Sequence, residues 1–89
     1  MTSTEAKTVV TNRTTTSQTL AANEFRKKLI ITNTANAVKY IRLADATASN
    51  TDHDIVLGVY RTPDATFVLD NYTGPVKADA ATVTYVELG

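Results

Sequence analysis

The chain has 89 residues, and its nine lysine and arginine residues balance its nine aspartate and glutamate residues. This balance argues against direct nucleic-acid binding, because nucleic-acid binders normally carry a positive excess that neutralises phosphates. The sequence contains no cysteine, which excludes disulfides and zinc sites with thiolate ligands. A chain this short buries only a thin core, so we expect oligomerisation or docking on a larger surface to add stability.

The sequence predicts a flexible N-terminal arm over residues 1–7 and a single β-sandwich domain over residues 8–89. No apolar run is long enough to cross a bilayer, and the first residues lack the hydrophobic stretch of a secretory signal. We therefore expect that the protein is made in the cytoplasm and does not associate with a membrane. About a fifth of the residues are threonine, whose β-branched side chain favours extended backbone.

The first half of the chain predicts a short strand at Thr8–Thr11, a turn at Asn12-Arg13 and a threonine-rich strand over Thr15–Leu20. Leu29-Ile30-Ile31 is a continuous apolar run, which favours a central strand that is buried on both faces and stops at Asn33. Val38–Leu43 alternates in polarity. After the short polar connection Asn33–Asn36, it completes the best hairpin candidate of the chain.

The second half begins with a long polar loop, Ala44–Asp54. A strand follows at Ile55–Leu57, and we expect it to continue through Val59–Arg61 past a bulge at Gly58. A turn at Thr62-Pro63-Asp64 leads to a strand over Thr66–Leu69, and a second turn at Asp70–Pro75 leads to strands at Val76–Ala78 and Thr82–Leu88. The predicted fold is therefore all-β, a small antiparallel β-sandwich or jelly roll of about seven to eight short strands.

The residues that could carry chemistry are few. His53 lies among Asp45, Asp52 and Asp54 in the long loop, which is one arrangement of an oxygen-rich metal site. The loop lacks the glycine and the terminal glutamate of a calcium-binding helix–loop–helix, and a lone histidine in a polar loop is usually solvated. No nucleophile–base pair and no glycine-rich phosphate loop is present. We therefore expect no enzyme activity, no catalytic residues, no cofactor and no bound metal.

Several residues are candidates for contact with other proteins. The basic run Arg26-Lys27-Lys28 favours a solvated strand edge, with contact to an acidic partner surface or to nucleic acid as the alternative. The four tyrosines, Tyr40, Tyr60, Tyr72 and Tyr85, favour a core edge or a subunit contact, with a stacking platform for a sugar or a base as the alternative. The candidate interface residues are Val9, Val10, Arg26, Lys27, Lys28, Ile30, Tyr40 and Tyr72.

Most of the chain from Leu20 to Gly89 resembles small β-sandwich virion proteins of tailed bacteriophages. The resemblance is carried by Asn23 followed by Arg26-Lys27-Lys28-Leu29-Ile30-Ile31-Thr32-Asn33, by Val38–Leu43, by Phe67-Val68-Leu69 and by Tyr72-Thr73-Gly74-Pro75-Val76. It implies a head decoration or cement protein in the virion. The implied partners are the major capsid protein or other virion proteins and further copies of the chain, with a trimer favoured. The alternatives are a tail, neck or head-fibre component and a carbohydrate-binding attachment module.

Overall fold

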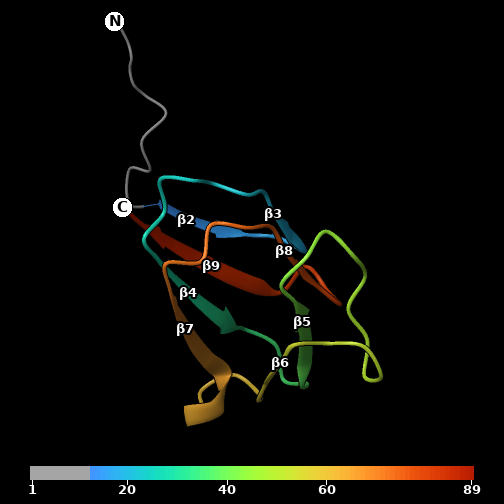
Figure 1. The fold of residues 1–89 in the computed structure, drawn as a ribbon. Helices are drawn as coiled ribbons and strands as arrows, with labels where there is room; N and C mark the ends of the chain where they lie inside the picture. Colours follow the sequence, from blue (N-terminus) through green and yellow to red (C-terminus); the bar gives the residue numbers. More distant parts are fainter. Residues whose placement is uncertain (1–12) are drawn as a thin grey trace, which may run out of the picture.

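The structure, a computed structural model, describes residues 13–89 as two antiparallel sheets of four strands each. The first sheet has the order β2-β9-β4-β7, and these strands span Arg13–Thr16, Val83–Leu88, Lys28–Asn33 and Thr66–Asp70. The second sheet has the order β3-β8-β5-β6, with bounds Thr19–Leu20, Val76–Ala78, Lys39–Arg42 and Ile55–Leu57. Figure 1 shows the strands of the first sheet side by side. The predicted all-β sandwich is confirmed.

The strands pair from the two ends of the described chain inwards. β2 pairs with β9, β3 with β8, β4 with β7 and β5 with β6, all antiparallel. This is the pairing of one long antiparallel ribbon that folds over itself to make two sheets, which is the jelly-roll topology. The contacts of β4 with β9 and of β5 with β8 complete the two sheets. Of the two predicted architectures, the strand order is therefore that of the jelly roll.

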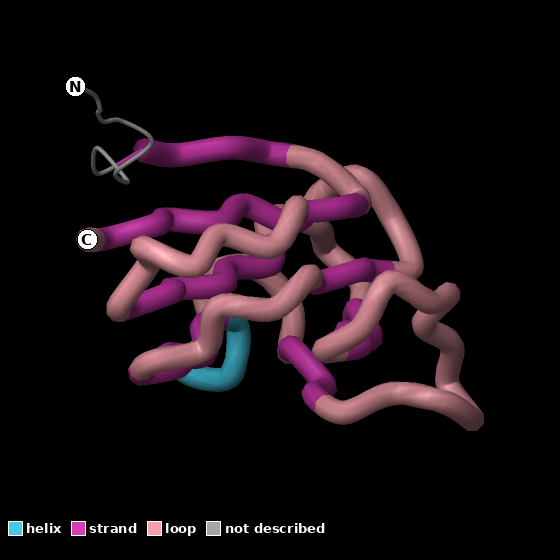
Figure 2. Tube along the Cα trace, turned by 45° about the horizontal axis from the view of Figure 1, so that its top comes forward, coloured by secondary structure: helices cyan, strands magenta, loops and turns pink. Residues whose placement is uncertain are grey.

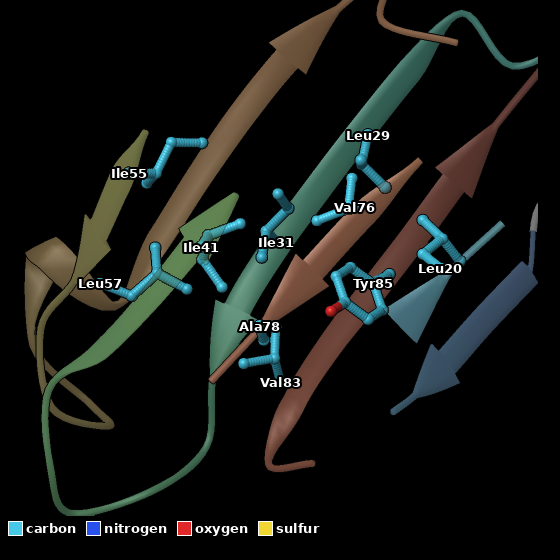
Figure 3. Close-up of a cluster of buried hydrophobic side chains, with 10 residues drawn as sticks. All are labelled: Leu20, Leu29, Ile31, Ile41, Ile55, Leu57, Val76, Ala78, Val83 and Tyr85. Carbon is cyan, nitrogen blue, oxygen red and sulfur yellow. The ribbon is translucent and has the colours of Figure 1, made fainter. Parts of the chain in front are cut away.

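The core lies between the two sheets and follows the alternation of the strands. In β4 every second side chain, Leu29, Ile31 and Asn33, is buried, and in β9 Val83, Tyr85 and Glu87 are buried in the same way. Figure 3 shows the apolar members of this set meeting side chains of the second sheet, among them Ile41, Leu57 and Val76. Burial of apolar area in this layer is the main favourable term for folding.

The prediction that Leu29–Ile31 is buried on both faces is wrong. β4 is central in its sheet, between β9 and β7, but Ile30 is only partly buried because it points to the outer face. An antiparallel sheet in a two-layer sandwich packs one face on the core and leaves the other to solvent or to a partner.

The predicted hairpin of Leu29–Asn33 with Val38–Leu43 is also wrong. β4 and β5 belong to different sheets, so the connection between them crosses the sandwich. The buried Asn33 side chain fixes this crossing, because its Nδ2 donates to the carbonyls of Ala37 (2.7 Å) and Gly58 (2.8 Å), and its Oδ1 accepts from the Ala35 amide (2.9 Å). Connections of hairpin length therefore do not establish strand pairing in a jelly roll.

Three local predictions differ from the structure. Arg13, expected in a turn, opens β2 and pairs with Glu87, and the strand predicted over Thr15–Leu20 breaks into β2 and β3 as the chain crosses between sheets. β6 ends at Leu57 and does not continue through Val59–Arg61. The Gly58 amide bonds the Asp64 carbonyl (2.8 Å) and so turns the chain towards β7. The strand predicted at Thr8–Thr11 and the predicted arm lie outside the described residues.

The expected turn around Pro63 is a single 3-10 turn, η1, at Pro63–Ala65, drawn in cyan in Figure 2. Proline suits this first helical position because its missing amide would have no intrahelical partner there. Within residues 13–89 no helix has the length and apolar character needed to cross a bilayer.

Candidate interaction surface

The outer face of the β2-β9-β4-β7 sheet carries two complete rows of side chains across all four strands. The register aligns Thr16 with Thr84, Thr84 with Thr32 and Thr32 with Thr66, so one row consists only of threonines. The neighbouring row, two residues along each strand, is mainly aliphatic. We call these two rows the threonine face, which comprises Thr14, Thr16, Ile30, Thr32, Thr66, Val68, Thr84 and Val86.

The hydroxyls of the threonine row bond one another. Thr16 Oγ1 and Thr84 Oγ1 are 2.9 Å apart, and Thr32 Oγ1 and Thr66 Oγ1 are 3.2 Å apart. A hydroxyl that loses water without another partner costs about 1–3 kcal/mol. Because these hydroxyls already have partners within the row, a docking protein can displace water from this row at a lower cost.

The aliphatic row aligns Thr14 with Val86, Val86 with Ile30 and Ile30 with Val68. Val68 keeps 49% of its surface exposed, although it is a large apolar side chain in the middle of a strand. Charge on this side of β4 and β7 is confined to one end, where Lys28 Nζ lies 3.9 Å from Asp70 Oδ1. The central part of the face is therefore uncharged and apolar, as in the buried centre of protein interfaces.

The candidate interface residues fall in different places. Ile30 lies on the threonine face, and Lys28 lies at its charged end. Tyr40 belongs to the other sheet, where its ring lies 5.0 Å from that of His53. Lys27 is exposed, but its backbone amide and carbonyl bond Leu88 and Asn71. Val9 and Val10 lie outside the described residues.

Arg26 was predicted to lie in an exposed basic run, and the structure contradicts this. Its side chain is completely buried, and its Nη1 donates to the equally buried Glu87 Oε2 at 2.9 Å. Its Nε donates to the Tyr72 carbonyl (3.1 Å) and its Nη2 to the Gly74 carbonyl (2.7 Å). Arg26 therefore ties β9 to the turn before β8 and is not a surface residue. No local pattern predicts this pairing, because Glu87 lies 61 residues further along the chain.

Tyr72 folds over the same turn. Its hydroxyl donates to the Pro75 carbonyl at 2.6 Å, and a Cβ added at Gly74 would lie 2.6 Å from that hydroxyl oxygen, so a side chain at this position would displace the Tyr72 ring. Burial raises the pKa of the Tyr72 phenol, while the Arg26 cation acts in the opposite direction. The Arg26 and Tyr72 segments, singled out separately in the sequence, thus meet in one structural junction.

The four tyrosines are not equally accessible. Tyr85 is fully buried, its hydroxyl donates to the Gln18 carbonyl (3.3 Å), and burial raises its pKa to about 12. Tyr72 packs against the core, whereas Tyr60 is 43% exposed, with the Arg61 guanidinium 5.4 Å from its ring centroid. A stacking platform made of some of the tyrosines therefore cannot include Tyr85.

The loop with His53 forms a small polar cluster. His53 Nδ1 lies 3.0 Å from the Ser49 carbonyl oxygen, and the Arg42 guanidinium makes ion pairs with Asp52 and Asp54. Asp54 also accepts a hydrogen bond from the Leu43 amide (2.8 Å). Among residues 13–89, no three acidic, histidine or cysteine side chains are grouped so that they could hold a metal ion.

A hollow of about 470 Å³ lies where the edge strands of the two sheets come together. Its walls come from β6, η1, β7 and Val38, and include the apolar side chains of Val56, Pro63 and Phe67. Val38, Val56 and Phe67 each keep more than two fifths of their surface exposed. A second hollow of similar size lies beside β3 and is lined by small or aliphatic residues together with Asp45. We call the first hollow the edge groove.

No family model matches the chain, and neither does any curated protein or solved structure. The surface features above therefore have to be interpreted from their own geometry.

Sequence reasoning missed most of the threonine face. Thr14 and Thr16, Thr32 and Thr34, and Thr82 and Thr84 are each two residues apart, so the period of a strand puts each pair on one side. This repeated spacing was the available signal. It could not be used further, because the strand register that aligns the pairs follows from long-range pairing.

Proposed function

We propose that this chain is a non-enzymatic structural protein of a tailed-bacteriophage particle, which binds the head surface through its threonine face. The proposal rests on one observation above all. Four strands present an uncharged surface of aliphatic side chains and mutually bonded threonines on the side of the sheet that points away from the core. Val68 is about half exposed and Ile30 and Val86 are partly exposed, and contiguous apolar patches of this kind often mark interaction sites.

The size of the face determines how such a protein would bind. Four strands at a spacing of about 4.8 Å, with two rows that each take up about 6.6 Å along the strands, give a projected area of roughly 250 Å². A standard protein interface buries about 800 Å² of accessible surface on each partner. One threonine face is therefore a weak contact, and durable attachment would need several linked copies acting together. A homo-oligomer on a repeating capsid lattice meets this requirement.

Two further observations support the particle assignment. The order of the Arg26–Asn33 and Tyr72–Val76 segments resembles small virion proteins of tailed phages, and in this fold the two segments meet at the Arg26 side chain. The jelly-roll topology recurs among viral capsid and lectin domains, which makes the assignment compatible at the level of fold analogy.

The test uses phage particles that lack this protein and the purified chain added back. We expect the wild-type chain to sediment with heads and to appear on their surface by electron cryo-microscopy, and a Val68→Lys variant to stay in the supernatant. Phe25→Lys is the matched control, because Phe25 is 41% exposed but belongs neither to the threonine face nor to the lining of the edge groove. Binding to tails rather than heads would replace the head assignment with the tail alternative, and binding to neither would contradict the proposal.

A further inference from the structure

The edge groove has the features of a site that accepts an additional strand. In the described part of the chain, β7 pairs only with β4, so its other edge carries main-chain donors and acceptors without a strand beside them. β7 also exposes Phe67, and the adjoining walls are the apolar side chains of Val38, Val56 and Pro63. Proteins usually protect a free edge with charges, proline or bulges. Here Asp70 stands at one end of β7 and Pro63 lies before it, whereas Phe67-Val68-Leu69 in the middle is apolar.

We propose that the segment Thr8-Val9-Val10-Thr11 of a second copy binds in the edge groove as a strand added to β7. The segment is uncharged and β-branched throughout, which suits an extended backbone with apolar side chains entering a groove. Lys7, which precedes it, has a charge opposite to that of Asp64 on the groove wall. Main-chain hydrogen bonds to β7 would supply affinity, and the valines would fill the groove.

The reach of the chain decides between the same copy and another copy. A strand added beside β7 lies four strand spacings from β2, where the described chain begins at Arg13, so about 19 Å must be crossed. Val10 is three residues from Arg13 and extends at most about 11 Å, and Val9 extends at most about 14 Å. Neither valine reaches the edge groove of its own copy. The contact must therefore be intermolecular.

This contact joins two different surfaces, a donor segment and an acceptor groove. Such a heterologous contact closes into a ring if the rotation between copies permits it and otherwise continues as a filament. It leaves most of the threonine face free, because Phe67 and Val68 point to opposite sides of β7 and only Thr66 belongs to both surfaces. The inference therefore does not depend on particle attachment, although linked copies would supply the multivalency that attachment needs.

The test is a complementation experiment with the full-length chain, measured by analytical ultracentrifugation. The donor variant Val9→Asp with Val10→Asp keeps an intact groove, and the acceptor variant Phe67→Lys keeps an intact segment. We expect the wild type to associate, each variant to remain a monomer, and an equal mixture to form a dimer and nothing larger, because the mixture allows one productive contact. Val68→Lys, on the opposite side of the same strand, should associate like the wild type.

The contradicting outcomes are equally specific. A wild type that stays monomeric, a donor variant that associates like the wild type, or a mixture of folded variants that remains monomeric would each overturn the inference. Thermal unfolding of each variant verifies that it is folded. Where Phe67→Lys fails to fold, Val56→Lys takes its place, because Val56 is 49% exposed on the other wall of the groove.

Discussion

The contact of Arg26 with Glu87 and with the Tyr72–Gly74 turn, which we call the Arg26 junction, buries charge in the interior. The threonine face does the opposite, because it exposes apolar side chains at the surface. At the junction a guanidinium and a carboxylate are completely buried and joined at 2.9 Å, whereas on the threonine face Val68 is half exposed in the middle of a strand. We therefore assign the first region to the stability of the fold and propose the second as its binding surface. Changes to the two regions should separate stability from binding.

Replacing Arg26 should have the largest effect on stability. Arg26→Met removes the cation that faces the buried Glu87 carboxylate and both hydrogen bonds to the Tyr72–Gly74 turn. Breaking a buried pair in this way costs about 3–5 kcal/mol. Urea unfolding of the wild type and the variant measures this loss. Lys27→Met, the neighbouring exposed change, should alter the free energy of unfolding by less than about 0.5 kcal/mol, and equal losses for both variants would refute the buried placement of Arg26.

The next largest effect should come from Asn33, which fixes the crossing from one sheet to the other. Asn33→Ala removes two donated bonds and one accepted bond in a buried place, so we expect a loss of about 2–3 kcal/mol in the free energy of unfolding. Asn36→Ala in the same connection is exposed and serves as the control. Denaturant midpoints that coincide for the two variants would contradict the role of Asn33.

Alkaline pH should weaken the fold through Tyr85. Burial raises the pKa of this phenol from 10.0 to about 12, so the unfolded chain releases its proton first as the pH rises. The stability linked to Tyr85 is therefore fully present below pH 10 and is lost as the pH rises towards about 12. Between these values the midpoint of urea unfolding should fall more steeply for the wild type than for Tyr85→Phe. Tyr72, whose pKa is also raised, accounts for a slope that remains in the variant. Parallel slopes would show that Tyr85 is not buried as a neutral phenol.

The smallest effect on stability should come from the threonine face itself. Thr84→Val keeps the shape of the side chain and removes one hydroxyl of the pair with Thr16. Because the face points outward, we expect a change within about 0.5 kcal/mol. Binding to particles should weaken, because the Thr16 hydroxyl loses its partner in the row and the removal of its water on docking then costs about 1–3 kcal/mol. A cosedimentation assay in which Thr84→Val binds as tightly as the wild type would show that the partner does not cover this row.

The sequence was sufficient for the fold class and for most strands. The alternation in Thr82–Leu88 and the apolar runs at Ile55–Leu57 and Thr66–Leu69 are local patterns, and each corresponds to a strand in the structure. The pairing of those strands was not accessible, because β4 and β5 are close in sequence yet lie in different sheets.

The candidate site was only partly predictable for the same reason. Ile30 was identified from its apolar run, but its neighbours across the face, Val68 and Val86, come from strands far along the chain. Arg26 was assigned to a basic surface run, because no local pattern shows that it pairs with Glu87 in the interior. Local patterns therefore predict the strands. The buried pair of Arg26 and Glu87 and the exposed apolar face depend on the pairing of segments that are far apart in the sequence, which local patterns do not predict.

The most direct test of the account is cosedimentation of the Val68→Lys variant with particles that lack this protein, together with its unfolding curve. The account predicts that the variant unfolds within about 0.5 kcal/mol of the wild type and no longer sediments with the particles. A folded Val68→Lys chain that binds as tightly as the wild type would contradict the assignment of the threonine face as the docking surface.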